Sequence, residues 1–359
     1  MLSEEELLKA LSSIKDSGSN RSVVDLGWLD QLRINHPKAI VRLNLPSYAQ
    51  SQRDRIAAEA KRIVESYREI SELQIELSNA NGQSEIGNAG HGQVSSLQKI
   101  PGVKNVIAVS SGKGGVGKST VAVNLACGLS QKGYSVGLLD ADIYGPNTPI
   151  MLGVSDKTPE VQGSGAEQKI IPIESFGISM VSMGLLIDDN QPVIWRGPML
   201  NGIIRQFLYQ ASWGEKDFLV VDLPPGTGDA QLSLAQAVPM SGVLIVTTPQ
   251  KVSLQDSRRG LAMFKQMNVP ILGVIENMSS FIPPDQPERE YAIFGTGGGQ
   301  VLSEENSVPL LAKLPLEMNT SNGNEEDKPI VFQYPDSKTA KAFERLALSV
   351  LEIIETNSN

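Results

Sequence analysis

Two patterns of apolar and polar positions divide this chain into parts. In the first part, apolar and polar residues alternate over 39–45 and 73–77, which predicts two half-buried strands. Residues 3–14 and 50–68 instead show the spacing of helices. Together these elements predict a small α+β domain over residues 1–80, a length within the usual range for a domain.

The pattern changes twice after this domain. Residues 81–99 are rich in Asn, Gly, Gln and Ser, a composition typical of a flexible linker. From there, over 100–359, short apolar runs alternate with helical patterns, which predicts an α/β domain with a mostly parallel sheet and helices on both faces. The expected strands are 106–109, 134–140, 218–222, 243–247 and 271–275, and the expected helices are 198–212, 229–237 and 253–267.

Two segments depart from this alternation. Residues 155–195 hold glycines, prolines and short β-like pieces, which predicts an inserted hairpin region. Residues 337–354 form an amphipathic helix whose end is acidic. Because a membrane-targeting helix carries a basic face, we expect this helix to pack against its own domain.

A glycine-rich segment joins the first strand of the α/β domain to a helix. Its sequence over 110–120, S-S-G-K-G-G-V-G-K-S-T, contains the pattern G-x-x-x-x-G-K-[ST] in the strand–loop–helix context that this pattern requires. Glycines let the backbone wrap a phosphate and turn its N–H groups inward, and the helix start adds a positive dipole end. The residues expected to hold the phosphates are Gly112, Lys113, Gly114, Gly115, Val116, Gly117, Lys118, Ser119 and Thr120.

Three side chains of this loop are candidates for chemistry. Lys118 is expected to contact the β- and γ-phosphates, and the Ser119 hydroxyl to bind Mg²⁺. The loop therefore predicts a nucleoside triphosphatase. A second lysine, Lys113, is unusual at this place, and is either a catalytic group or a solvated loop cation.

Three aspartates follow apolar strands. Asp140 and Asp142 come at the end of 134–140, and Asp222 ends the run F-L-V-V-D. Open parallel sheets bind ligands at the carboxyl ends of their strands, so these carboxylates are expected beside the phosphate loop. There Asp140 and Asp142 are expected to organise Mg²⁺ through water or to orient the attacking water. Asp222 is expected to be the acid that binds Mg²⁺. The alternative for Asp140 and Asp142 is a charged pair at the sheet edge.

Later loops supply further candidates. The segment L-P-P-G-T-G-D over 223–229 is stiff and glycine-rich, and Gly226 is expected to approach the γ-phosphate, so that the loop senses hydrolysis. The Asn277 amide both donates and accepts hydrogen bonds, and is expected to contact adenine, with Pro315 as a wall of the base site. A structural role in a loop is the alternative for Asn277 and Pro315.

Composition narrows the function classes. The chain has 359 residues, with 31 Lys and Arg against 40 Asp and Glu, a formal net charge of −9. This acidic balance argues against a nucleic-acid partner or an anionic membrane surface. No apolar run is long enough to span a membrane, the first residues are acidic where a signal peptide would be basic, and the single cysteine, Cys127, excludes an internal disulfide. We therefore expect a cytoplasmic protein.

Seven motifs follow one another through the α/β domain: S-S-G-K-G-G-V-G-K-S-T, L-L-D-A-D-I-Y-G-P, W-R-G-P-M, V-V-D-L-P-P-G-T-G-D, T-T-P-Q, E-N-M-S and I-F-G-T-G-G-G. This series resembles the Mrp/ApbC family of iron–sulfur cluster carrier ATPases, within the MinD/ParA class of deviant P-loop ATPases. The first 80 residues resemble the small α+β domain of iron–sulfur assembly factors, with V-D-L-G-W at 24–28 as the matching stretch.

The resemblance implies an ATP hydrolase that works with Mg²⁺ as a nucleotide-switched homodimer. It implies that Lys113 reaches the partner subunit's nucleotide, that Asp142 orients the attacking water and that Asp140 belongs to the metal shell. It also implies transfer of a [4Fe–4S] cluster to client apoproteins. For Arg196, in the W-R-G-P-M motif, contact with nucleotide, contact with a partner and a structural role all stay open.

Two departures from the family concern the cluster. Relatives usually carry C-x-x-C between N-M-S and I-F-G, so that two subunits offer four thiolates, whereas F-I-P-P-D-Q-P at 281–287 has no cysteine. The first domain also lacks the cysteine that relatives carry near 47–51. Thiolates are the normal ligands of such clusters, and Cys127 is expected to be a buried core residue. Three functions stay open: a cluster carrier with ligands from a partner, an ATP-switched assembly factor that binds no cluster, and a positioning ATPase.

Overall fold

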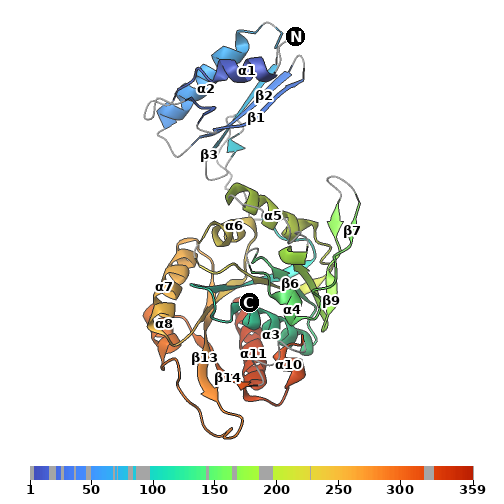
Figure 1. The fold of residues 1–359 in the computed structure, drawn as a ribbon, viewed down its shortest axis with the longest axis vertical. Helices are drawn as coiled ribbons and strands as arrows, with labels where there is room; N and C mark the ends of the chain where they lie inside the picture. The colour runs from blue at the N-terminus through green and yellow to red at the C-terminus, as the bar shows by residue number, and fades with distance from the viewer. Residues whose placement is uncertain are drawn as a thin grey trace. The chain divides into compact units, whose positions relative to one another are not determined.

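The chain folds as two compact units, Met1–Val94 and Ser95–Asn359 (Figure 1). The division falls within the stretch expected to be a linker, 81–99. The computed structural model describes residues 4–15, 22–25, 28–35, 38–45, 50–67, 69–70, 72–79, 84–85, 98–142, 145–163, 168–185, 197–226, 228–318 and 327–358.

The first unit is a four-stranded sheet with two helices. In sheet order, its strands are β1 (Leu29–Asn35), β2 (Lys38–Leu45), β3 (Glu72–Asn79) and β4 (Ser84–Glu85). The helices are α1 (Glu4–Leu11) and α2 (Gln50–Glu65), and α2 connects the parallel strands β2 and β3. Leu7 of α1, Leu43 of β2 and Ile56 of α2 are buried in one core, so both helices pack on the sheet.

The sequence pattern predicted four of these six elements. The expected strands 39–45 and 73–77 are β2 and β3, and the expected helices 3–14 and 50–68 are α1 and α2. β1 was missed because its register with β2 shifts after its first residue, so its apolar residues do not alternate regularly. β4 was missed because it is two residues long and lies in the expected linker.

The second unit is built on an eight-stranded sheet in the order β14-β13-β12-β5-β11-β6-β10-β9. All neighbouring strands are parallel except β9, which runs antiparallel to β10. The strands are β5 (Val103–Ser111), β6 (Val136–Asp140), β9 (Ile173–Ser175), β10 (Ile178–Ser182), β11 (Lys216–Asp222), β12 (Gly242–Thr247), β13 (Ile271–Ile282) and β14 (Leu310–Glu317).

Helices cover both faces of this sheet (Figure 1). On β5, Ile107 and Val109 belong to one core, whereas Val106 and Ala108 belong to the other. Because both faces are buried, the strand is apolar without interruption, as expected for a parallel α/β sheet. One face packs against α3 (Lys118–Gln131), α10 (Ile330–Gln333) and α11 (Lys338–Ser358), and the other against α5 (Gly197–Gln210), α6 (Asp229–Ala237), α7 (Lys251–Gln266) and α8 (Gly298–Asn306).

Some segments differ in detail from the expectation. The 155–195 region adds β9 and β10 to the main sheet and forms a separate antiparallel pair, β7 (Val161–Gln162) with β8 (Lys169–Ile170), instead of one hairpin. Its last described residues form a short 3₁₀ helix, Met183–Leu185, and 186–195 lie outside the described part of the chain. The four-residue helix α4 (Thr148–Met151) was not predicted. β13 continues seven residues beyond the expected 271–275, with a register shift after Asn277.

The expected C-terminal helix is α11, and it packs against its own domain as predicted; its partners there are α3 and β14. Its buried residues, among them Phe343 and Leu346, belong to the same core as α3. Within the described part of the chain, no helix combines the length and the apolar character that crossing a bilayer requires.

Candidate nucleotide-binding site

The phosphate loop connects β5, in the middle of the sheet, to α3. Gly115 and Gly117 have φ angles of +77° and +80°, in the left-handed region that residues with a Cβ rarely adopt. A Cβ on Gly117 would also collide with the Asn277 amide, and one on Gly112 with the backbone of α7 at Asp256. Conformation and space therefore both require glycine here.

The loop lines a cavity of about 180 Å³. The cavity brings together Lys113, Lys118 and Asp142, the three residues predicted to be catalytic. Val116 instead packs into the core below the loop. The lining residues are Ser111, Lys113, Gly114, Gly115, Gly117, Lys118, Ser119, Thr120, Asp142, Asn147, Met151 and Pro225.

Lys118 is buried between two carboxylates. Its Nζ atom lies 2.6 Å from Asp222 Oδ1 and 3.7 Å from Asp142 Oδ2. It also lies 3.5 Å from the Ser119 hydroxyl. A buried ammonium group needs such partners, since an isolated charge away from water is costly. The loop lysine thus lies in one cluster with Asp142, two residues after the end of β6, and Asp222, the last residue of β11.

Asp140 is surrounded by hydrogen-bond donors. Its Oδ1 accepts from the Asp142 N–H group at 3.0 Å, and its Oδ2 accepts from the Thr148 N–H and hydroxyl groups at 3.3 and 2.8 Å and from the Ser182 hydroxyl at 3.2 Å. Burial, and then the charge of Asp222, raise the pKa of Asp140 to about 7. Because both oxygens are occupied, the geometry favours Asp140 as a residue that positions Asp142 and α4, over direct contact with a metal ion.

Asp222 has the better geometry for Mg²⁺. Its side chain is fully buried, and its Oδ2 atom has no hydrogen-bond partner among the described residues. Burial raises its pKa, and the nearby Lys118 charge opposes that shift. A buried carboxylate oxygen without a donor, close to the Ser119 hydroxyl, fits a hard cation that prefers oxygen ligands. The residues present therefore fit Mg²⁺.

Lys113 differs from Lys118 in its surroundings. Its side chain is half-buried, and no described carboxylate lies within ion-pair distance of it. Its carbonyl accepts a 2.9 Å hydrogen bond from the Ser111 hydroxyl, which fixes the loop backbone while leaving the ammonium group out of that contact. Among the described residues, the Lys113 ammonium group therefore stands outside the cluster of Lys118, Asp142 and Asp222.

The remaining predicted residues lie around the loop in different ways. Asn277 Nδ2 donates to the Val116 carbonyl at 2.9 Å, so this amide holds the loop in place. The Gly226 N–H group donates to the Ser111 carbonyl at 2.9 Å, and its neighbour Pro225 lines the cavity in its place. Pro315 lines a separate cavity at the edge of the sheet. Contacts of these three residues with nucleotide stay predictions, and Arg196 lies outside the described residues.

Sequence reasoning missed residues that support the site. Gln231 of α6 is buried, and it accepts a 3.2 Å hydrogen bond from the Ser110 hydroxyl while donating one of 2.7 Å to the Pro224 carbonyl. It therefore ties the 223–229 loop to the end of β5. Asn147 and Met151 of the cavity were also missed. The only local signal was that both follow the D-A-D-I-Y-G-P motif within a few residues.

The comparison with known families agrees with this geometry. The model of the NUBPL iron-transfer P-loop NTPase family matches residues 102–351, almost the whole second unit. The chain belongs to this family. A model described as an iron–sulfur cluster assembly protein matches residues 4–77 of the first unit. In this NUBPL-family protein, the resemblance of the second unit to iron–sulfur carrier P-loop ATPases and that of the first unit to iron–sulfur assembly factors are therefore both confirmed.

Relatives and solved structures support the same placement. The iron–sulfur cluster carrier protein of Synechocystis sp. is 49% identical over 350 residues, which are 98% of this chain and 97% of the relative. A nucleotide-binding protein from Archaeoglobus fulgidus, solved in complex with ADP, aligns with a TM-score of 0.55 and 31% identity over 66% of this chain and 94% of its own. The cell division ATPase MinD of Pyrococcus furiosus aligns with a TM-score of 0.52 and 25% identity over 69% and 99%. The predicted fold class is confirmed.

The residues of this NUBPL-family chain do not fit an iron–sulfur cluster. Cys127 is fully buried inside α3, as expected, and burial raises the pKa of its thiol to about 12. The segment that follows β13 has no cysteine. Among the described residues, no three His, Cys, Asp or Glu side chains gather to hold a metal ion. Since clusters are held by thiolates, the ligands for a cluster carried as cargo would have to come from elsewhere.

Proposed function

We propose that this protein is a cytoplasmic ATPase that uses Mg²⁺, works as a nucleotide-switched homodimer and promotes the transfer of iron–sulfur clusters to client apoproteins. The observation that carries the proposal is the buried cluster of Lys118 with Asp222 and Asp142 beside the phosphate loop. Family membership supports the iron–sulfur role, and the P-loop fold supports nucleotide hydrolysis.

The first step of the proposed cycle is an exchange of partners at Lys118. The Lys118 ammonium group is held by Asp222 in the structure. A bound triphosphate would offer stronger negative charge, so Lys118 would turn to the phosphates, and Asp222 together with the Ser119 hydroxyl would hold Mg²⁺. Mg²⁺ when bound offsets the charge of the phosphate oxygens.

The next step is hydrolysis. Asp142 lies in the same cavity as Lys118 and is proposed to orient the water that attacks the γ-phosphate. The loop after β11 contacts this cavity through Pro225 and is fixed to β5 by the Gly226 and Gln231 hydrogen bonds. Loss of the γ-phosphate would therefore change the contacts of the 223–229 loop, and this loop is the proposed switch.

Lys113 gives the proposed reason for dimerisation. Its ammonium group is left out of the buried cluster, so it is available to the nucleotide of a second subunit. A positive charge that arrives only in the closed dimer stabilises the transition state more than the ground state. Hydrolysis would then be coupled to closure of two chains.

The chain lacks the thiolates that usually hold a cluster, and this decides which form of the carrier function we propose. The chain acts on a cluster whose ligands belong to a partner, and the absence of an exposed thiol among the described residues supports this form of the carrier function. The same observation favours a second candidate, an ATP-switched assembly factor that never contacts the cluster. Both candidates use the same nucleotide site.

Anaerobic reconstitution tests direct cluster binding. The full chain, incubated with ferrous iron and sulfide and then desalted, is expected to retain no charge-transfer absorption, because its only thiol is buried. A matched variant, Pro283→Cys with Gln286→Cys, restores a C-x-x-C spacing in a turn closed by the Gln286 N–H to Pro283 carbonyl hydrogen bond. This variant is expected to retain the absorption. Stoichiometric cluster on the unmodified chain would contradict the partner-ligand proposal.

A further inference from the structure

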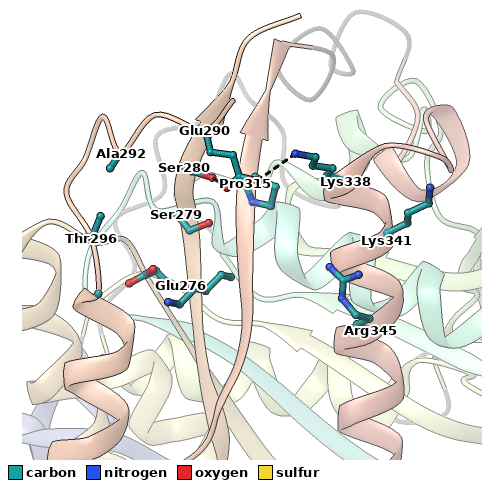
Figure 2. A pocket seen from close by; sticks show the side chains of 12 residues that line it. Glu276, Ser279, Ser280, Glu290, Ala292, Thr296, Pro315, Lys338, Lys341 and Arg345 are labelled. Carbon is teal, nitrogen blue, oxygen red and sulfur yellow. Dashed lines mark hydrogen bonds and ion pairs between the residues drawn. The ribbon is translucent and has the colours of Figure 1, made fainter. Parts of the chain in front are cut away.

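A second cavity, of about 580 Å³, lies at the edge of the sheet formed by β13 and β14. It shares no lining residue with the phosphate-loop cavity. Figure 2 shows Lys338, Lys341 and Arg345 of α11 on one side of β14, and Ser279 and its neighbours on the other. The volume lies within the range of ordinary ligand sites.

The cavity carries more positive charge than its own carboxylates neutralise. Glu290 is engaged by Lys338 at 3.3 Å and by the Ser280 hydroxyl at 2.9 Å, and Glu276 accepts a hydrogen bond from the start of α8. The other cations of the wall make no ion pair with any residue in the described part of the chain; they are Lys313, Lys341 and Arg345. On a chain with a net charge of −9, this is a local positive surface.

Two exposed apolar side chains flank one residue of the cavity wall. Tyr291 and Ile293 are 46% and 53% exposed, and Ala292 between them lines the cavity. Two hydrogen bonds of 2.8 Å between the backbones of Phe281 and Tyr291 hold this segment against the end of β13. Tyrosine and arginine are enriched among residues that dominate protein–protein binding. The combination favours a protein partner over a small anion.

We propose that this cavity is a docking site for an acidic segment of a partner protein. Carboxylates of that segment pair with Lys313, Lys341 and Arg345, and one apolar side chain packs against Tyr291 and Ile293. The proposal rests on the proposed function, in which the partner brings the cluster ligands that this chain lacks. The positive cavity adjoins the segment after β13, so an acidic partner would be held beside it.

The test uses the full chain and short fluorescein-labelled peptides, read by fluorescence anisotropy at low salt. The first peptide interleaves glutamates with leucines, the second has glutamine and the third lysine at each glutamate. The variant Lys341→Glu with Arg345→Glu reverses two cavity charges. Its control, Lys99→Glu with Lys157→Glu, makes the same charge change at two exposed lysines away from this cavity.

The glutamate peptide is expected to bind the unaltered chain and the control variant alike, and the cavity variant about tenfold more weakly or worse, since each exposed ion pair contributes modestly. The lysine peptide is expected to prefer the cavity variant. The proposal would be overturned if the glutamate peptide bound all three proteins equally or bound none of them. It would also be overturned if the glutamine peptide bound the unaltered chain as tightly as the glutamate peptide does. Tighter binding of a single-stranded oligonucleotide that the cavity variant loses would do the same.

Nucleotide affinity separates this proposal from the proposed function. The cavity variant is expected to bind MgATP as the unaltered chain does, because Lys341 and Arg345 belong to α11 and lie outside the phosphate-loop cavity, and Pro315, the predicted wall of the base site, is unchanged in it. If the peptide binds as expected while the unaltered chain shows no affinity for MgATP, the ATPase proposal fails and the docking site stands. If MgATP binds and the peptide does not, the docking site alone fails.

Discussion

Lys118→Ala is expected to weaken MgATP binding about a hundredfold or more, because it removes a charged contact to the phosphates. It is also expected to lower the free energy of unfolding of the second unit by about 3 kcal/mol, since Asp222 would stay buried without its cation. Calorimetry with MgATP and denaturant titration without nucleotide measure the two effects separately.

The loss of stability is expected to depend on pH. Burial raises the pKa of Asp222, and the pKa of Asp140 is raised to about 7. A carboxyl group whose pKa is raised by folding contributes stability that is lost as the pH rises from its unfolded pKa, near 3.8, to its folded pKa. Lys118 opposes both rises, so its removal extends this loss to higher pH. The variant should be more destabilised at about pH 8 than at about pH 5.

Lys118→Arg is the matched variant for this prediction. It keeps the positive charge beside Asp222, so most of the stability is expected to return, while the larger guanidinium group fits the phosphate loop poorly and nucleotide affinity stays low. Undiminished MgATP affinity in Lys118→Ala would show that the lysine is only a structural partner of Asp222.

Lys113→Ala is expected to leave MgATP affinity nearly unchanged and to slow phosphate release about a hundredfold, as removal of one group that stabilises the transition state does elsewhere. Folding should be spared, because the Lys113 side chain makes no ion pair with a described residue. The measurement compares steady-state phosphate release with calorimetry on the same preparation. Unaltered turnover would exclude a catalytic role.

A mixing experiment tests whether Lys113 acts in the partner's site. Lys113→Ala and Lys118→Ala chains are each expected to be nearly inactive. In a mixed dimer, the Lys113→Ala chain still binds nucleotide, and the other chain supplies an intact Lys113 to it. Mixing should therefore restore turnover. If no activity returns although mixed dimers form, Lys113 acts within its own subunit.

Local patterns revealed the phosphate loop, and distant contacts explain what they missed. Residues 106–120 could be interpreted directly because strand, glycine loop and helix are consecutive. The ion pair between Lys118 and Asp222 joins residues 104 positions apart, so no spacing rule indicates it, although the position of each at an element end predicted their common edge. Two side chains, those of Thr148 and Ser182, donate hydrogen bonds to Asp140. Neither residue stands in a motif that marks it as a partner of Asp140. The sequence therefore could not show whether Asp140 is a metal ligand or a positioning residue.

The fold shows the same division between local and distant information. Strands buried on both faces, such as 218–222, are apolar throughout and were predicted. β1 was missed because its pairing with β2 shifts register, and the extension of β13 was missed because it follows a register shift beside β14. The cations of the edge cavity come from β14 and α11, which are separated in sequence. Only the fold brings them together.

The central claim is that this chain binds a magnesium–nucleotide complex at the Lys118–Asp222 cluster. Titration calorimetry of the unaltered chain with ATP, with Mg²⁺ and then with a chelator, tests it most directly. We expect saturable binding with Mg²⁺ and clearly weaker binding with the chelator, because Asp222 and Ser119 contribute only through the cation. No measurable binding, or the same affinity with and without Mg²⁺, would contradict this account.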